Sequence, residues 1–296
     1  MKVLVTGGKG MLGRTLRRWL VPQHEIFVAD LPETDILQPA SLDAAFGAFH
    51  PDAVIHCAAM TKVDDCESNE ELAFRLNGMG SANVARACRD HGARLIAIST
   101  DYVFDGRRAE GDYSETDFPR PQTVYGKSKL AGERSALDIL PDATILRIAW
   151  LYGAGGPSFV HTMAKLGAQE GAPLKVVDDQ RGNPTSTDAV AGALSFLLDH
   201  PAITGVVHGT CEGVCTWYGL TVELFRLLGL KRPVTPCTTA EFPRPAPRPA
   251  NSALAKTVLA AHGYAMPRWQ DALAAFVAAS KSESAKTPLT AGREIW

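Results

Sequence analysis

The chain of 296 residues is long enough for one large domain, or for a large domain and a small one, with a full core. Lys and Arg total 30 against 32 Asp and Glu, so bulk charge attracts neither nucleic acid nor an anionic membrane. The N-terminus lacks a basic segment followed by a long apolar run, and no stretch approaches 18 apolar residues. We therefore expect a cytoplasmic protein without nucleic-acid or membrane partners.

Short apolar runs alternate with amphipathic segments through the first half of the chain. They predict strands at 2–6, 25–30, 53–58, 94–99 and 143–148, with helices near 11–20, 40–49, 69–90 and 122–138. Apolar strands that are each followed by a helix are typical of a parallel sheet covered on both faces. Right-handed crossovers predict a doubly wound α/β sheet of Rossmann type, with ligands at the carboxyl ends of its strands.

The pattern loosens after residue 150, which ends the predicted Rossmann domain at 1–150. A helix near 187–199 and a strand at 205–209 are expected to rejoin the sheet, within about 185–210. The stretch FPRPAPRPAN at 242–251 is expected to be a loop, because proline removes backbone donors and restricts its neighbours. The remaining assignments are a smaller C-terminal substrate-binding part at 151–280 and a polar tail at 281–296.

A glycine-rich segment runs from the first strand straight into the first helix. Its residues Gly7, Gly10 and Gly13 fit the pattern GxxGxxG. Such a turn lets backbone N–H groups approach a pyrophosphate at a helix N-terminus, which predicts a dinucleotide cofactor. Asp30 ends the second strand, where a carboxylate can accept the ribose hydroxyls and repel a 2′-phosphate. Asp30 favours NADH and Lys9 could pair with a 2′-phosphate, so we expect NADH with tolerance of NADPH.

Tyr125 and Lys129 lie four residues apart at the start of a predicted helix, so they share one face. A neighbouring ammonium stabilises a phenolate, and we expect it to lower the pKa of Tyr125. Tyr125 would then donate a proton to a carbonyl oxygen while hydride arrives from a nicotinamide. Thr100, with Ser99 as the alternative, follows the fourth strand and is expected to hydrogen-bond the same oxygen. An exposed helix that carries Tyr and Lys without a catalytic role is the competing interpretation.

Seven segments together resemble the extended short-chain dehydrogenase/reductases from residue 1 to about 278. They are TGGKGMLG, AAMTKVD, STDYVF, YGKSKLAGE, RIAWLYG, DDQRGNPT and RPANSAL. The resemblance is strongest to members that reduce dTDP-4-dehydro-L-rhamnose to dTDP-L-rhamnose. It implies an NAD(P)H-dependent enzyme acting on a nucleotide-diphosphate sugar.

The resemblance also assigns roles to residues. Tyr125 would be the proton donor, Lys129 its partner and a ligand of the cofactor ribose, and Thr100 the third catalytic residue. The implied cofactor contacts are Gly7, Gly10, Met11, Leu12, Gly13, Asp30, Asp35, Ile36, Cys57, Ala58, Ala59, Tyr125 and Lys129. The implied substrate contacts are Thr100, Asp101, Tyr102, Trp150, Arg248 and Asn251. Trp150 would face the sugar, and the guanidinium of Arg248 would meet the diphosphate.

The sequence departs from the family pattern at two positions. Some relatives use a carboxylate at position 15 in a magnesium-bridged dimer, and Thr15 cannot supply that charge. We therefore expect no metal site, whereas a homodimer stays open. Asp65 stands where many relatives have a basic residue. The six cysteines show no CxxC pair and are expected to be reduced thiols.

Three other functions compete with reduction by this chain. A 4,6-dehydratase needs an acid and a base beside the sugar, and Asp101 is followed by Tyr102 rather than by a second carboxylate. Epimerisation at C4 is disfavoured but stays open. A non-catalytic subunit that binds a dinucleotide and a partner enzyme is the alternative from another class.

Overall fold

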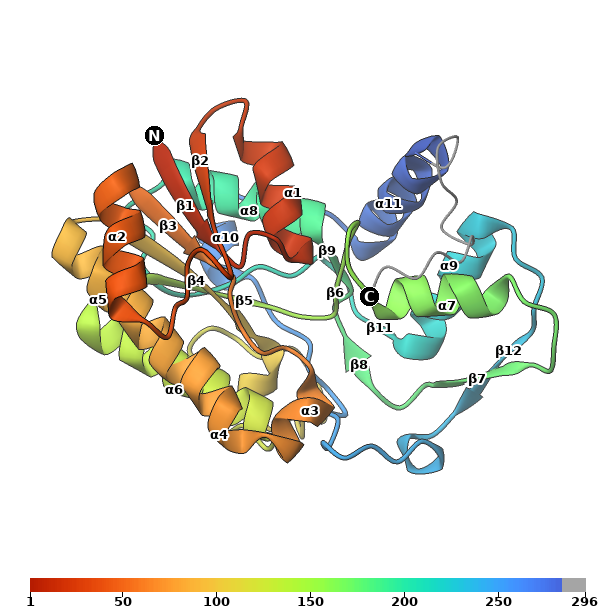
Figure 1. Ribbon diagram of the computed structural model, residues 1–296. Helices are drawn as coiled ribbons and strands as arrows, with labels where there is room; N and C mark the ends of the chain where they lie inside the picture. The colour runs from red at the N-terminus through yellow and green to blue at the C-terminus, as the bar shows by residue number, and fades with distance from the viewer. Residues whose placement is uncertain (284–296) are drawn as a thin grey trace.

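The computed structural model describes residues 1–283, and at its centre lies a six-stranded sheet (Figure 1). The strands are β1 (Lys2–Thr6), β2 (Glu25–Ala29), β3 (Ala53–His56), β4 (Arg94–Thr100), β5 (Thr144–Ile148) and β10 (Gly205–His208). They lie in the order β10-β5-β4-β3-β1-β2, and every neighbouring pair is parallel. The chain moves outward in opposite directions from β1 and β3, so the topological switch point lies between these two strands.

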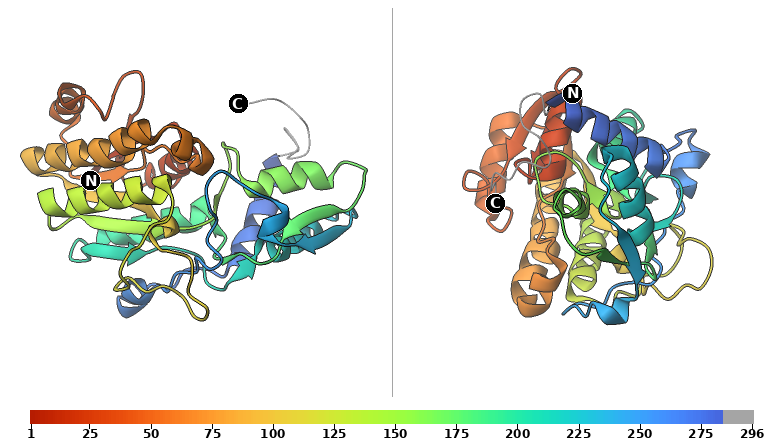
Figure 2. Two further views of the ribbon diagram at one scale, coloured as in Figure 1. Left: turned by 90° about the horizontal axis from the view of Figure 1, so that it is seen from below. Right: turned by 90° about the vertical axis from the view of Figure 1, so that its right-hand side faces the viewer.

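Helices cover both faces of this sheet, as Figure 1 and Figure 2 show. Alternate strand residues point to opposite faces, so Val3 and Val5 belong to one apolar cluster and Leu4 to another. The first cluster includes α1 (Met11–Leu20) and α8 (Thr187–Asp199), and the second includes α2 (Pro39–Phe49), α5 (Gly80–His91) and α6 (Val124–Ile139). The predicted doubly wound fold is therefore confirmed.

The helix predicted near 69–90 is divided in the structure. After α3 (Val63–Ser68), the chain forms α4 (Glu70–Ala73) and a π-helix over Phe74–Met79, and only then α5. Buried Asn77 lies in the π-helix and exchanges two hydrogen bonds with the backbone of Met60, at 2.8 and 3.0 Å. It also donates to Ser128 Oγ on α6 at 2.9 Å. The π-helix thus joins the loop after β3 to α6, two segments that reach the site described below.

The second half of the chain forms a smaller lobe beside the sheet (Figure 1). In this lobe β7 (Leu174–Val177) pairs with β12 (Val234–Cys237). The other elements of this half are β6 (Leu151–Tyr152), α7 (Phe159–Gly167), β8 (Arg181–Gly182), β9 (Thr185–Ser186), β11 (Cys215–Thr216), α9 (Trp217–Leu228), α10 (Thr257–Ala261) and α11 (Trp269–Glu283). Between β9 and β11, the chain returns to the large sheet as α8 and β10.

Two predicted irregular segments lie in this half. The proline-rich segment 242–251 contains no helix or strand, in agreement with the expected loop. It reaches back to the large lobe, where Asn251 donates to the backbone oxygens of Arg108 and Gly111. Of the predicted tail at 281–296, residues 281–283 end α11, and the rest lies outside the described residues.

Candidate active site

A cavity of about 770 Å³ opens at the carboxyl edge of the six-stranded sheet. The segments that follow β1, β2, β3, β4 and β5 line it, together with the first turns of α1 and α6. Seventeen predicted site residues lie around this one space: Gly7, Gly10, Met11, Leu12, Gly13, Asp30, Asp35, Ile36, Cys57, Ala58, Ala59, Thr100, Asp101, Tyr102, Tyr125, Lys129 and Trp150. The parallel topology brings them together from segments far apart in the sequence.

The glycine loop leaves no room for side chains. Gly7 has a φ of +65°, and a Cβ there would lie 2.7 Å from the backbone nitrogen of Ala58. A Cβ on Gly13 would overlap the backbone of Gly8, so strand and helix can approach closely only with glycine at 13. Gly10 precedes α1 without a side-chain cap, which leaves the first N–H groups of that helix for a ligand. This cradle fits the pyrophosphate of a dinucleotide.

Asp30 is fixed at the end of β2 by the glycine loop. Its carboxylate accepts hydrogen bonds from the backbone nitrogens of Lys9 and Leu31, both at 2.8 Å. The Lys9 ammonium donates to the Leu31 oxygen at 2.6 Å and pairs with Glu33 at 2.8 Å. The hydrogen bond from Lys9 holds the pKa of Glu33 below its usual value. Asp30 and Asp35 thus line this part of the cavity, and the Lys9 ammonium beside them is already paired with Glu33.

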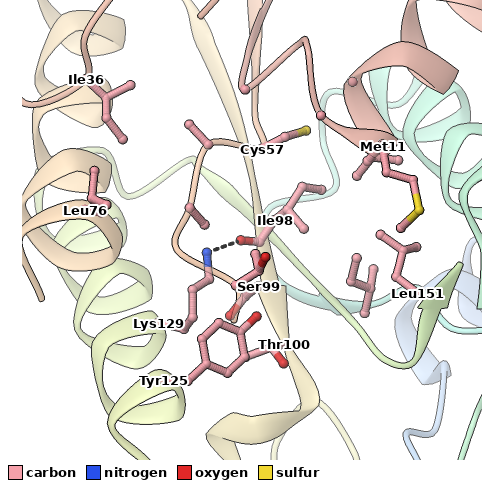
Figure 3. Close-up of a pocket in the computed structure, with 18 of the residues that line it drawn as sticks. Met11, Ile36, Cys57, Leu76, Ile98, Ser99, Thr100, Tyr125, Lys129 and Leu151 are labelled. Carbon is pink, nitrogen blue, oxygen red and sulfur yellow. Dashed lines mark hydrogen bonds between the residues drawn. The ribbon is translucent and has the colours of Figure 1, made fainter. Parts of the chain in front are cut away.

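Lys129 lies on α6 with its side chain buried against the end of β4. Its ammonium donates to the Ile98 carbonyl oxygen at 2.7 Å, the dashed line in Figure 3. Burial lowers the pKa of Lys129 to about 8, while the anionic forms of Glu133 and Cys57 act in the opposite direction. At neutral pH the group is charged, but it releases its proton more readily than an exposed lysine.

Tyr125 lies in the first turn of the same helix, beside Lys129 and Thr100 in Figure 3. Thr123 caps this end of α6 by accepting a hydrogen bond from the backbone nitrogen of Gly126 at 3.0 Å. Burial raises the pKa of Tyr125 above its usual value, and only the adjacent Thr100 side chain lowers it. The expectation that Lys129 lowers this pKa is therefore wrong, because desolvation dominates. The phenol is protonated at neutral pH, the state that a proton donor requires.

Thr100 and Asp101 form the turn at the end of β4. The Thr100 hydroxyl accepts from the Tyr102 nitrogen at 3.2 Å and donates to Asp101 Oδ1 at 3.0 Å. Burial raises the pKa of Asp101 to about 6, and its Oδ2 has no partner among the described residues. The Ser99 hydroxyl donates to Glu133 instead. Of the two predicted alternatives, Thr100 is therefore the one beside the phenol.

A buried ion pair between α6 and β5 was not predicted. Glu133, one turn beyond Lys129 on α6, accepts two hydrogen bonds from Arg147 of β5, at 2.9 and 2.6 Å. Their side chains are only 4% and 3% exposed. The signal in the sequence was the spacing of Glu133, four residues after Lys129, but nothing local indicated its partner. The pair anchors α6, and with it Tyr125 and Lys129, to the sheet.

Trp150 follows β5 and stacks on Trp217, the first residue of α9. No feature of the sequence indicated a role for Trp217. The ring centroids are 3.4 Å apart and the planes are inclined by 4°. Trp150 has a φ of +47°, a conformation that costs on the order of 1–3 kcal/mol for a residue other than glycine. The surrounding contacts must therefore offset this strain.

Arg248 and Asn251 lie away from the large cavity. Arg248 lines a cavity of about 310 Å³ that shares Tyr102 with the large one, and it pairs with Asp64 at 2.8 Å. Asn251 is buried, lines neither cavity, and donates its amide to two loop carbonyls at 3.0 and 3.1 Å. Asp65 is exposed and pairs with Lys62 at 3.7 Å.

Residues 1–283 contain neither a group of side chains suited to a metal ion nor a helix suited to a membrane. No cluster of three or more His, Cys, Asp or Glu side chains suited to a metal ion occurs there. Thr15 is buried between α1 and α8, where its hydroxyl donates to Thr187 at 2.9 Å. Within the same range, no helix has the length and apolar character needed to cross a membrane.

The sheet order, the glycine loop and the Tyr125/Lys129 pair define a Rossmann-type protein of the extended short-chain dehydrogenase/reductase class. More particularly, the chain belongs to the family described as RmlD substrate binding domain, whose model matches residues 1–282. The family resemblance inferred from the seven motif segments is confirmed.

Known proteins resemble the chain over nearly its full length. It is 44% identical over 278 residues to the dTDP-4-dehydrorhamnose reductase of Streptomyces griseus, covering 91% of each chain. It is 43% identical to the probable dTDP-4,6-dihydroxy-2-methyloxan-3-one 4-ketoreductase of Streptomyces antibioticus, covering 92% of this chain and 93% of that one. A crystal structure of dTDP-4-dehydrorhamnose reductase from Bacillus anthracis in complex with NADP has a TM-score of 0.90 at 36% identity, covering 94% and 99%.

Proposed function

We propose that this chain is an NAD(P)H-dependent oxidoreductase that reduces the 4-keto group of dTDP-4-dehydro-L-rhamnose to give dTDP-L-rhamnose. The observation that carries the proposal is the meeting of Tyr125, Lys129 and Thr100 at the cavity that also contains the glycine loop. The relative named for this substrate, 44% identical to the chain, supports the choice of sugar. The relative named as another 4-ketoreductase favours a different nucleotide 4-keto sugar as the second candidate.

The chemistry follows from the states of these side chains. A bound reduced nicotinamide supplies a hydride to the ketone carbon. Tyr125 donates its phenolic proton to the ketone oxygen, and burial keeps this phenol protonated at neutral pH. Lys129 is charged below its pKa of about 8, and its ammonium is proposed to bind the cofactor ribose beside Tyr125. Thr100 hydrogen-bonds the same oxygen and holds the ketone within reach of Tyr125.

The substrate is proposed to bind between the two lobes, with residues 151–280 as the smaller substrate-binding part. Trp150, Asp101 and Tyr102 line the large cavity and are proposed to contact the sugar. Arg248 is kept as the proposed diphosphate contact, because Tyr102 lines both its cavity and the large one. Asn251 is left out, because its amide already donates to two loop carbonyls.

NADH is the proposed preferred cofactor, with tolerance of NADPH. Asp30 at the end of β2 is placed to accept ribose hydroxyls, and Glu33 adds a second negative charge nearby. Lys9 could oppose this preference, but its ammonium is already paired with Glu33. A 2′-phosphate would therefore enter a region of surplus negative charge.

The remaining expectations concern metal, assembly and location. No metal-dependent step is part of the proposal, and a dimer bridged through position 15 is not proposed, because Thr15 packs against Thr187. We propose a cytoplasmic location, because the reaction consumes a reduced dinucleotide.

Nicotinamide absorbance tests the proposal. Purified protein is incubated with NADH or NADPH and each of several nucleotide 4-keto sugars. We expect consumption of the dinucleotide, fastest with dTDP-4-dehydro-L-rhamnose. If the dinucleotide is consumed faster with another sugar, the proposed substrate is wrong, but the assignment as an oxidoreductase holds. No consumption with any sugar, combined with tight dinucleotide binding, would instead support a non-catalytic subunit.

A further inference from the structure

Trp150 is held in a conformation that its own backbone disfavours. It lies between β5 and β6 with a φ of +47°, and it lines the large cavity. A bulky side chain in the left-handed region is uncommon, and such residues persist where their surroundings over-determine them. The contacts of its indole therefore indicate what fixes it.

Trp217 covers one face of that indole. The two rings are nearly parallel, with centroids 3.4 Å apart. The backbone of Gly182 lies against the same indole so closely that a Cβ would overlap it. Only a residue without a side chain fits there, so Trp150 is confined by Gly182 as well as by Trp217.

Trp217 is itself fixed by two further contacts. Its indole N–H donates to Gln180 Oε1 at 2.9 Å, and Phe159 packs against it at a centroid distance of 4.4 Å. Gln180 in turn donates to Thr239 Oγ1 at 2.9 Å. Trp217 thus belongs to the small lobe, whereas Trp150 continues a strand of the large sheet. The indole stack joins the two lobes beside the cavity.

We infer that Trp217 is a positioning residue, which presets the indole of Trp150 for the sugar of the nucleotide-sugar substrate. Trp217 does not line the cavity, so it acts through Trp150. A side chain that is already ordered saves the entropy that binding would otherwise lose. The inference rests on the proposed function, which makes Trp150 a sugar contact.

Two substitutions test the role of Trp217. In Trp217→Leu the stack is lost, and in Trp217→Phe a smaller ring keeps part of the contact and loses the hydrogen bond to Gln180. We expect Trp217→Leu to weaken binding of the product dTDP-L-rhamnose, and to raise KM for the keto sugar, by about tenfold. We expect about threefold for Trp217→Phe. Dinucleotide affinity should be unchanged, because the glycine loop lies on the other lobe, and kcat should change by less than about twofold.

Fluorine NMR with 5-fluorotryptophan reports the position of Trp150 directly. The chain has five tryptophans, and the resonance of Trp150 is assigned from the Trp150→Phe variant. In the wild type we expect one sharp, ring-current-shifted resonance for Trp150. In Trp217→Leu it should broaden and move toward the shift of an unstacked indole. Trp19→Phe, a change on an exposed part of α1, is the matched control and should leave the Trp150 resonance and all affinities unchanged.

The outcomes separate the inference from the proposed function. If wild-type protein does not bind dTDP-L-rhamnose, the proposed substrate is wrong and the inference fails with it. If wild-type protein binds and a folded Trp217→Leu binds equally well, only the inference is overturned. Equal weakening of dinucleotide and sugar would also overturn it, since that result indicates a structural role. If Trp217→Leu does not fold, the same criteria apply to Trp217→Phe.

Discussion

Tyr125 is the residue whose removal best separates chemistry from binding. Tyr125→Phe keeps the ring that packs against Tyr102 and removes only the hydroxyl. We expect kcat to fall by about 10²-fold or more, the usual scale for a positioned acid, while dinucleotide affinity stays unchanged. Steady-state kinetics and equilibrium binding measure the two effects. Tyr218→Phe, which removes the same atom outside the cavity, should behave like the wild type, and wild-type turnover in Tyr125→Phe would exclude Tyr125 as the acid.

Glu33 offers a second test at the scale of a single residue. Its carboxylate pairs with Lys9, the only lysine in the glycine loop. Glu33→Gln removes a negative charge beside Asp30 and releases the Lys9 ammonium. We expect NADPH to bind about two- to fivefold more tightly, since exposed charges interact only weakly in water, and NADH to bind unchanged. Calorimetry with both dinucleotides measures the ratio, and Glu25→Gln on β2 is the control. An equal change for both dinucleotides would mean that Glu33 does not affect cofactor choice.

Among the elements, α6 and β5 are joined by the buried pair of Glu133 and Arg147. Glu133→Gln leaves a buried guanidinium without its counter-charge, and we expect the free energy of unfolding to fall by about 3–5 kcal/mol. The double variant Glu133→Gln, Arg147→Met removes both charges and should recover most of that loss, because no buried charge is left without a partner. Denaturant unfolding of four proteins measures this: the wild type, Glu133→Gln, Arg147→Met and the double variant. Two single-variant losses that simply add in the double variant would show that the side chains are not coupled.

The hydrophobic pattern of the sequence predicted the positions of most helices and strands in the first half of the chain. The helix predicted at 11–20 is α1, and each predicted strand of the first half agrees with the structure to within two residues at either end. The helix near 69–90 was predicted without its π-helix. Asn77 in this π-helix forms side-chain hydrogen bonds with Met60 and Ser128, and contacts with residues distant in the sequence leave no periodic signal.

At the scale of the whole molecule, parallel topology made much of the site predictable. Strand ends of one parallel sheet meet at one edge, so Gly7, Asp30, Thr100 and Tyr125 could be assigned to one cavity from their places in the chain. No comparable rule predicts which side chains of the two lobes contact each other. Trp217 lies 67 residues after Trp150, and no spacing predicts that the two would stack. The upward shift of the Tyr125 pKa was also not predicted, because the spacing of two residues on a helix does not show how deeply they are buried.

Identification of the product tests the central claim most directly. Purified protein, NADH and dTDP-4-dehydro-L-rhamnose are incubated, and the sugar nucleotide is examined by NMR. We predict dTDP-L-rhamnose. When the transferable position of the NADH is deuterated, the new hydrogen on C4 of the product should be deuterium. If the product is instead the C4 epimer of dTDP-L-rhamnose, the substrate assignment is wrong, but the chain is still a reductase. Unchanged keto sugar beside intact NADH would contradict the proposed reduction of this sugar with NADH.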